Sequence, residues 1–174
     1  MTKLLLSIHV LAAIVAIGPV TVAASMFPAA TRRALAEPAD PRGVAVLRNL
    51  HRICRVYATL GVLVPVFGLA TARSMDVLGD AWLITSIIVT VAAAAVLIAL
   101  VLPGQAAILA DDRPAGDGPA GDCLASGGTG QSPGGAIQGR RAATRLGMVT
   151  GIFNLLWAVV VVLMIVRPGS TTGA

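Results

Sequence analysis

The chain has 174 residues, of which 56% are hydrophobic and 12% are charged, and its formal net charge is +5. A soluble domain carries about 25% charged residues, so this composition excludes an ordinary soluble protein. The basic residues flank the apolar segments and do not form a patch with interleaved aromatic side chains, which argues against a nucleic-acid-binding surface. We therefore expect the lipid bilayer as partner, and no nucleic acid.

Four separated apolar runs determine the predicted fold class. Each has about 20 residues or more, enough for an α-helix to cross a ~30 Å hydrocarbon core. The runs are Leu4–Phe27, Ile53–Ala72, Ala81–Leu102 and Leu146–Val166. We predict an all-α polytopic membrane protein, a single domain over residues 1–174 folded as a four-transmembrane-helix bundle. The expected helices cover about 3–27, 41–73, 81–109 and 143–167.

Prolines mark the expected bends and ends of these helices. Gly18-Pro19 predicts a kink in the first helix, which we expect to end near Pro28. Asp40-Pro41 is a helix start signal, and Pro65 predicts a bend in the helix that follows. Pro103-Gly104 predicts an end or a kink in the third helix.

Residues 111–141 are rich in glycine and proline and contain a short tandem repeat of Pro-Ala-Gly-Asp. Such a composition cannot bury enough apolar surface to offset the entropy lost on ordering. We expect this segment to be a flexible cytoplasmic linker.

Basic residues predict the orientation, because cytoplasmic loops near membrane ends retain Lys and Arg. The two long linkers and their flanks carry ten: Arg32, Arg33, Arg42, Arg48, Arg52, Arg55, Arg113, Arg140, Arg141 and Arg145. The opposite side carries three: Lys3, Arg73 and Arg167. We expect a multi-pass protein of the plasma membrane with both termini outside and both long linkers in the cytoplasm.

A cleaved signal peptide is the alternative for the first run, because Lys3, an apolar stretch and small residues up to Ser25 fit that pattern. Cleavage after Ala24 would leave the arginine-rich first linker outside the cell. The charge rule therefore favours a retained helix.

Arg48, Arg52 and Arg55 are spaced i, i+4, i+7 and share one helix face. We expect them to contact anionic lipid headgroups, as basic residues next to a membrane commonly do. A substrate-binding patch is the alternative.

Small residues form faces on two helices, and such faces let membrane helices approach closely. On the first helix, Ala16 and Ala23 follow His9 at intervals of seven residues. On the last helix, Gly147 and Gly151 precede Asn154, for which we expect a hydrogen bond between helices. These faces can also serve a homo- or hetero-oligomer.

His9 is the one ionisable residue well inside an apolar run, and no acidic residue lies inside any of the four. This disfavours proton pumps, cation exchangers and intramembrane acid–base hydrolases. Six residues into its helix, His9 lies about 9 Å below the outer surface, whereas His51 lies at the opposite interface. The two histidines therefore cannot share a metal ion or a haem iron in one monomer.

A single imidazole can be an axial haem ligand, a weak metal ligand or a proton relay. The alternative is a neutral His9 that donates a hydrogen bond to a backbone carbonyl or to Thr85, Ser86 or Thr90. Cys54 and Cys123 are far apart in the sequence and show no metal-binding spacing, so we expect neither a disulfide nor a metal site built from them.

The string Ile8-His9-Val10-Leu11-Ala12-Ala13, with Gly18-Pro19 and Phe27-Pro28-Ala29 after it, resembles the first helix of an uncharacterised bacterial family of predicted integral membrane proteins. It is distantly similar to copper-resistance-D-like membrane domains and to the four-helix protoporphyrinogen oxidase. Residues 48–57 resemble the start of these families' second helix.

The resemblance implies a four-helix bundle whose first-helix histidine holds haem b or a metal, and His9 is the matching position. The third helix lacks the lysine of the oxidase, so we expect an accessory role rather than that activity. We predict an integral membrane protein that binds haem or a metal through His9, with no catalytic residue identified. The alternatives are a small haem-dependent membrane oxidoreductase and a structural subunit or scaffold of a membrane assembly.

Overall fold

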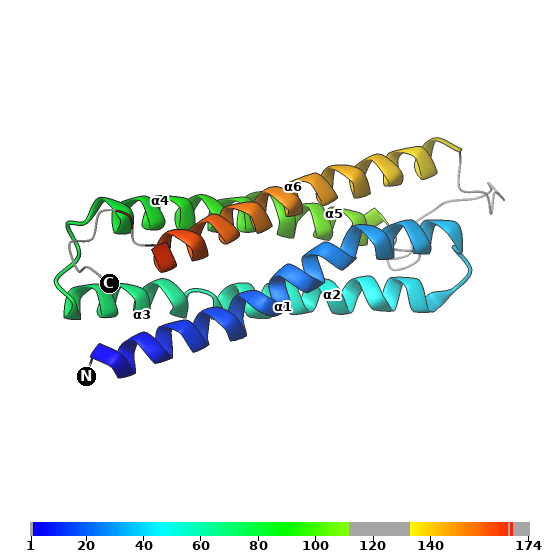
Figure 1. Ribbon diagram of the computed structural model, residues 1–174. Coiled ribbons are helices and arrows are strands. Elements are labelled where there is room, and N and C mark those ends of the chain that lie inside the picture. The colour runs from blue at the N-terminus through cyan, green and yellow to red at the C-terminus, as the bar shows by residue number, and fades with distance from the viewer. Residues whose placement is uncertain (1, 112–132, 167, 169–174) are drawn as a thin grey trace, which may run out of the picture.

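The computed structural model describes residues 2–111, 133–166 and 168, and this part of the chain is helical with no strand. The elements are α1 (Thr2–Ala36), α2 (Pro41–Leu60), α3 (Leu63–Ser74), α4 (Ala81–Val96), the π-helical turn η1 (Leu97–Val101), α5 (Leu102–Asp111) and α6 (Pro133–Val166). They make four rods, because α3 continues the line of α2, and η1 and α5 continue α4 (Figure 1).

All four rods are long and apolar enough to cross a membrane. The candidate spans are Lys3–Ala36, Pro41–Ser74, Ala81–Ala110 and Ile137–Val166. The predicted all-helical architecture with four membrane-length helices is therefore confirmed.

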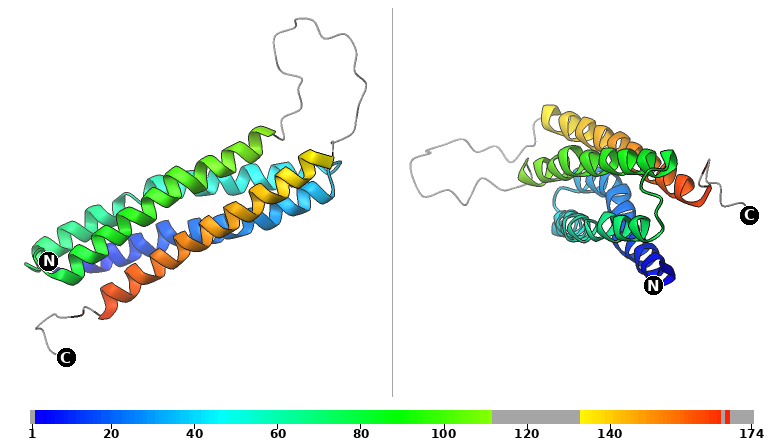
Figure 2. Two further views of the ribbon diagram at one scale, coloured as in Figure 1. Left: turned by 90° about the horizontal axis from the view of Figure 1, so that it is seen from above. Right: turned by 90° about the vertical axis from the view of Figure 1, so that its left-hand side faces the viewer.

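α1 is the central rod, because it contacts α2, α3 and α6. α4 packs on α6, and α5 returns to α2, which closes the bundle (Figure 2). The main core lies where these rods meet, and its buried members are Val20, Ala23, Ala24, Phe27, Leu47, Leu50, Cys54, Ala93, Leu97, Val101, Leu146 and Phe153. A smaller cluster of Ala72, Trp82 and Leu83 joins α3 to α4 at the other end.

α1 does not end near Pro28, as expected from the sequence, but continues to Ala36. A proline inside a helix removes one backbone donor, and packing can offset that loss. Here Phe27 is fully buried in the core, and the Thr31 hydroxyl donates to the Phe27 carbonyl at 3.0 Å. The extra turns also pack on α2, where a Cβ placed on Gly43 would lie 3.1 Å from Cβ of Ala34.

The helix that contains Pro65 is interrupted a few residues before the proline and is not merely bent by it. Proline has no N–H with which to reach the carbonyl four residues back, that of Gly61. The chain instead forms a turn at Gly61–Val62, where the Val64 N–H donates to the Gly61 carbonyl at 3.1 Å. The expected single helix over 41–73 is therefore two helices, α2 and α3.

Pro103 is accommodated by the π-helical turn η1. In this turn the Leu102 N–H reaches the carbonyl of Leu97, five residues back. The wider turn accommodates a residue that cannot donate to the ordinary partner, and the helix continues as α5 to Asp111. The sequence left open an end or a kink here, and the helix continues through an irregular turn.

The expected linker over 111–141 is shorter in the structure. Residues 133–141 are the first turns of α6, while 112–132 lie outside the described residues. Packing explains this extension, because a Cβ placed on Gly139 would lie 3.0 Å from a methyl of Leu35 on α1. Composition favoured a linker, but contact with the extended end of α1 supports a helix.

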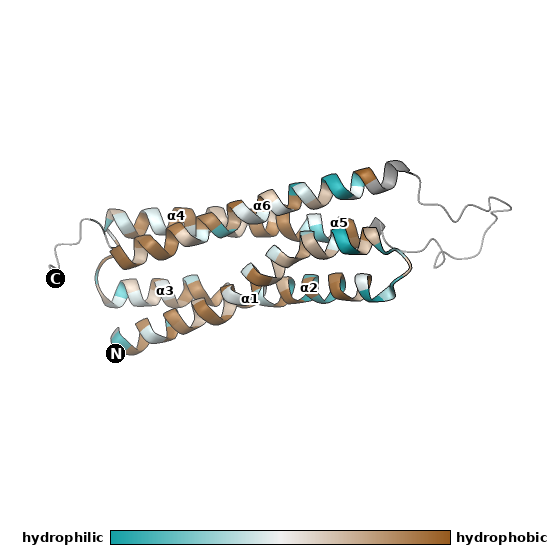
Figure 3. Ribbon diagram, turned by 45° about the vertical axis from the view of Figure 1, so that its right-hand side comes forward, coloured by the Kyte–Doolittle hydropathy of each residue, from teal (hydrophilic) through white to brown (hydrophobic). Residues whose placement is uncertain are grey.

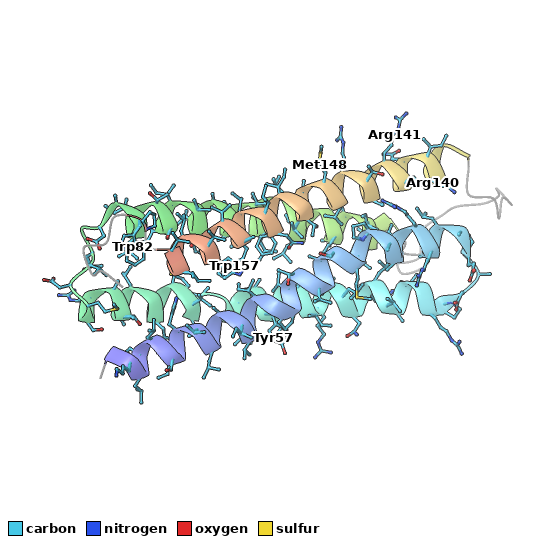
Figure 4. The ribbon with its side chains drawn as sticks, viewed as in Figure 1. Tyr57, Trp82, Arg140, Arg141, Met148 and Trp157 are labelled. Carbon is cyan, nitrogen blue, oxygen red and sulfur yellow. The ribbon has the colours of Figure 1, made fainter. Side chains whose placement is uncertain are left out.

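Basic residues gather at the end of the bundle that holds the α1–α2 turn and the start of α6, which lies on the right in Figure 1 and where the ribbon in Figure 3 carries much of its hydrophilic (teal) colour. We call this the basic end; its described members are Arg32, Arg33, Arg42, Arg48, Arg52, Arg55, Arg140, Arg141 and Arg145. Lys3 and Arg73 lie toward the opposite end. Figure 4 shows Arg140 and Arg141 near the basic end of α6, and Trp82 and Trp157 toward the other.

Cysteine labelling tests the expectation that the basic end faces the cytoplasm. Glu37 lies in the turn at this end and Leu78 in the turn at the other, and both are exposed. In a Cys123→Ser background, we expect an impermeant maleimide to label Leu78→Cys in intact cells and Glu37→Cys only after permeabilisation. The buried thiol of Cys54 should stay unlabelled in the folded protein. The reverse pattern would contradict the orientation.

Candidate functional site

His9 lies half-buried on α1 and faces α3. Its ring nitrogen Nδ1 lies 3.0 Å from the backbone carbonyl oxygen of Val64. A carbonyl only accepts hydrogen bonds, so Nδ1 carries the proton in this contact. In the neutral imidazole the other nitrogen, Nε2, is then the one with a free lone pair.

Gly68 allows this contact, because it lies one turn after Val64 and presents no side chain to the ring. A Cβ placed on Gly68 would lie 2.8 Å from Cε1 of His9, which is closer than carbon atoms can approach. Within α3 the Val64 carbonyl has two lone pairs, so it can accept from His9 in addition to its helical partner. The absence of a side chain at Gly68 therefore leaves the space that the imidazole ring of His9 occupies.

Of the partners considered for a neutral His9, the backbone carbonyl is the one found. Thr85, Ser86 and Thr90 donate instead to carbonyls of their own helix, at 2.7 to 2.8 Å. The role of His9 as a cofactor ligand remains a prediction, and the contact with Val64 is compatible with it. Metal- and haem-ligating histidines usually donate their second ring nitrogen to such an acceptor.

His51 takes part in a separate polar cluster near the basic end. Its Nδ1 lies 3.0 Å from Oε1 of Gln105, whose Nε2 donates to the Cys54 sulfur at 3.5 Å. Gln105 is fully buried between α2 and α5. Gln105 is a lone amide in an apolar helix, but because an amide does not ionise, its role is not evident from the sequence alone.

The two histidines lie far apart, as expected. Val64, the partner of His9, follows His51 by 13 positions, which is about 20 Å along the α2–α3 rod. The described residues also contain no group of three or more His, Cys, Asp or Glu side chains that could hold a metal ion.

Asn154 forms the interhelical hydrogen bond predicted for it. Its Nδ2 donates to the Ser25 hydroxyl of α1 at 3.0 Å. Its Oδ1 and the Thr150 hydroxyl, one turn earlier on α6, are buried without a hydrogen-bond partner among the described residues. Neither Ser25 nor Thr150 was identified from the sequence, since each is a small hydroxyl that can bond its own backbone.

The small-residue faces divide between internal and open surfaces. On α1, Ala16 and Ala23 are buried inside the bundle. On α6, Gly147 packs near Pro28, since a Cβ placed on Gly147 would lie 3.7 Å from Cγ of the Pro28 ring. A Cβ placed on Gly151 would meet nothing within 4 Å. The face of α6 around Gly151 is thus open.

No protein-family model, no curated protein and no solved structure matches this chain. The geometry of the described residues therefore carries the functional proposal, and the resemblance drawn from the first helix remains a prediction.

A methyl group at position 68 tests the contact with His9. We expect Gly68→Ala to lower the free energy of unfolding in detergent by about 1–3 kcal/mol, because the added Cβ displaces the imidazole ring. Gly18→Ala is the matched control, since an added Cβ there meets nothing within 4 Å. That variant should be neutral or stabilised by up to about 1 kcal/mol. Equal stability of the two variants would contradict the close packing of His9 on α3.

Proposed function

We propose that this protein is an integral membrane protein with an accessory role that binds haem through Nε2 of His9. The observation that carries the proposal is the hydrogen bond from Nδ1 of His9 to the Val64 carbonyl. It orients the ring and leaves Nε2 as the nitrogen with a free lone pair. The resemblance of the first helix to families with a ligating histidine points to the same residue.

The ligand supply favours haem over a bare metal ion. A protein-held zinc or copper ion needs three or four ligands, and the described residues bring together no such group. Haem brings four nitrogen ligands of its own and needs one axial residue from the protein. His9 on its own is therefore sufficient for haem, and when bound the haem would supply redox or ligand-binding chemistry.

Absorption spectroscopy of purified protein from haem-supplemented cells tests the proposal. We expect a Soret band that is absent in His9→Ala and reduced in Gly68→Ala, whose added methyl displaces the ring. His51→Ala and Gly18→Ala are the controls and should keep the band. Colourless wild-type protein, or a band that survives in His9→Ala, would refute haem binding at this residue.

A structural role in a membrane assembly is the second candidate, and the open face of α6 supports it. Gly151 and Ala158 are exposed there, and Leu155 between them is 66% exposed. Small residues beside a protruding leucine suit close packing against another membrane helix. If the protein has this structural role, the hydrogen bond of His9 to Val64 serves to hold α1 against α3.

Self-association in detergent tests this second candidate. We expect Gly151→Leu to shift the protein toward monomer in sedimentation-equilibrium measurements, because the added side chain keeps helices apart. Ala94→Leu is the matched control, since Ala94 is exposed on α4, a different helix. A wild-type protein that is monomeric at all concentrations, or equal effects of both variants, would argue against self-association through α6.

A further inference from the structure

A shallow, open groove of about 310 Å³, which we call the cleft, lies along α2 near the basic end. Its lining residues are His51, Arg52, Arg55, Val56 and Thr59. Arg48, the first member of the predicted arginine stripe, does not line it. The structure thus divides the stripe into two arginines inside the cleft and one outside.

The cleft is positively charged and contains no acidic group. Both Arg52 and Arg55 are exposed, and no ion pair joins either of them to a carboxylate in the described part of the chain. The acidic side chains nearest in sequence are Asp40, the N-cap of α2, and Glu37 in the turn before it, and they precede the two arginines by about three to five helical turns. Unpaired guanidinium groups at this spacing suit a phosphate, which they bind through charge-assisted hydrogen bonds.

His51 contributes a polar group with a fixed orientation. The fully buried Gln105 holds Nδ1 of His51, so Nε2 is the ring nitrogen left to interact with an occupant of the cleft. The Thr59 hydroxyl donates to the Arg55 carbonyl at 3.0 Å, and its oxygen can still accept a hydrogen bond. The cleft therefore combines two cations with a positioned imidazole and a hydroxyl.

The position of the cleft along the rod favours a lipid over a free anion. A ~30 Å hydrocarbon core needs about 20 residues, and counting back from Ser74 at the far end of α3 reaches Arg55. Below the arginines the same face is apolar and open, with Val56 49% and Leu60 41% exposed. The lipid headgroup region would thus lie at the arginines, and the start of the acyl chains would lie along Val56 and Leu60.

We infer that this cleft binds the phosphate of an anionic phospholipid, with Arg52 and Arg55 as the phosphate ligands, His51 as a supporting contact, and Val56 and Leu60 along an acyl chain. This goes beyond the haem proposal and does not depend on it. It is also narrower than general attraction between a basic surface and a membrane, because it assigns Arg48 no part.

Thermal unfolding in detergent with added lipid tests the inference. We expect phosphatidylglycerol to raise the unfolding midpoint of the wild-type protein more than phosphatidylcholine does. Arg52→Gln and Arg55→Gln should each raise the concentration of phosphatidylglycerol for half-maximal stabilisation by about tenfold or more, because each removes a charge-assisted hydrogen bond to the phosphate. Arg48→Gln has the same charge change on the same helix but removes no contact with the phosphate, so its shift should be smaller, at most about fivefold, the effect of general attraction to an anionic surface.

Gln105→Met tests the role of His51 without changing charge. For this variant the rise in unfolding midpoint is measured relative to the variant without lipid. We expect phosphatidylglycerol to raise the midpoint less than it does in the wild-type protein. Equal losses in Arg48→Gln and Arg52→Gln would overturn the inference in favour of a diffuse basic surface. Equal stabilisation by inorganic phosphate and by phosphatidylglycerol would overturn the lipid assignment in favour of a soluble anion. Neither readout involves haem.

Discussion

A polar group buried among apolar helices has no water to bond, so an amide, hydroxyl or imidazole there is stabilised by a partner inside the protein. Among the described residues, the buried side-chain atoms that lack such a partner are the Thr150 hydroxyl and Oδ1 of Asn154. The hydroxyls of Thr85, Ser86 and Thr90 find their partners within their own helix. Side chains that cannot do so bond across the bundle, as His9 does with Val64 and Asn154 with Ser25. These few hydrogen bonds are directional, so they help to fix how the helices are oriented against one another, whereas the small and aliphatic residues in the rest of the interface pack without such directionality.

Two of the polar contacts between rods lie beside proline interruptions. Val64, which accepts from His9, directly precedes Pro65, and Gln105, which bonds His51, follows Pro103 by two residues. A proline frees backbone groups and changes the direction of a helix, and neighbouring helices can compensate for both effects. The α2–α3 turn and the π-helical turn are therefore the places where sequence, local geometry and polar contacts coincide. The first lies next to the proposed haem ligand, and the second next to the His51 cluster.

The four long rods were predictable because hydrophobic length is a strong signal over about 20 residues. Helix ends were less predictable. The continuation of α1 past Pro28 and the early start of α6 depend on contacts between these two helices, such as Gly139 against Leu35, and composition cannot report such contacts. For the candidate site, the sequence indicated His9 and Asn154 but not their partners. Val64 contributes only its backbone, and Ser25 and Gln105 acquire their roles only when distant segments come together.

The dependence of His9 on Gly68 has a consequence for related sequences. The imidazole occupies the space that a side chain at position 68 would fill, so neither residue can change alone without loss of the contact. Among related chains we expect these two positions to vary together, with histidine accompanied by glycine and a bulkier residue on α3 accompanied by a small one on α1. Such a covarying pair would identify relatives of this protein more specifically than four apolar runs, a feature that unrelated membrane proteins share.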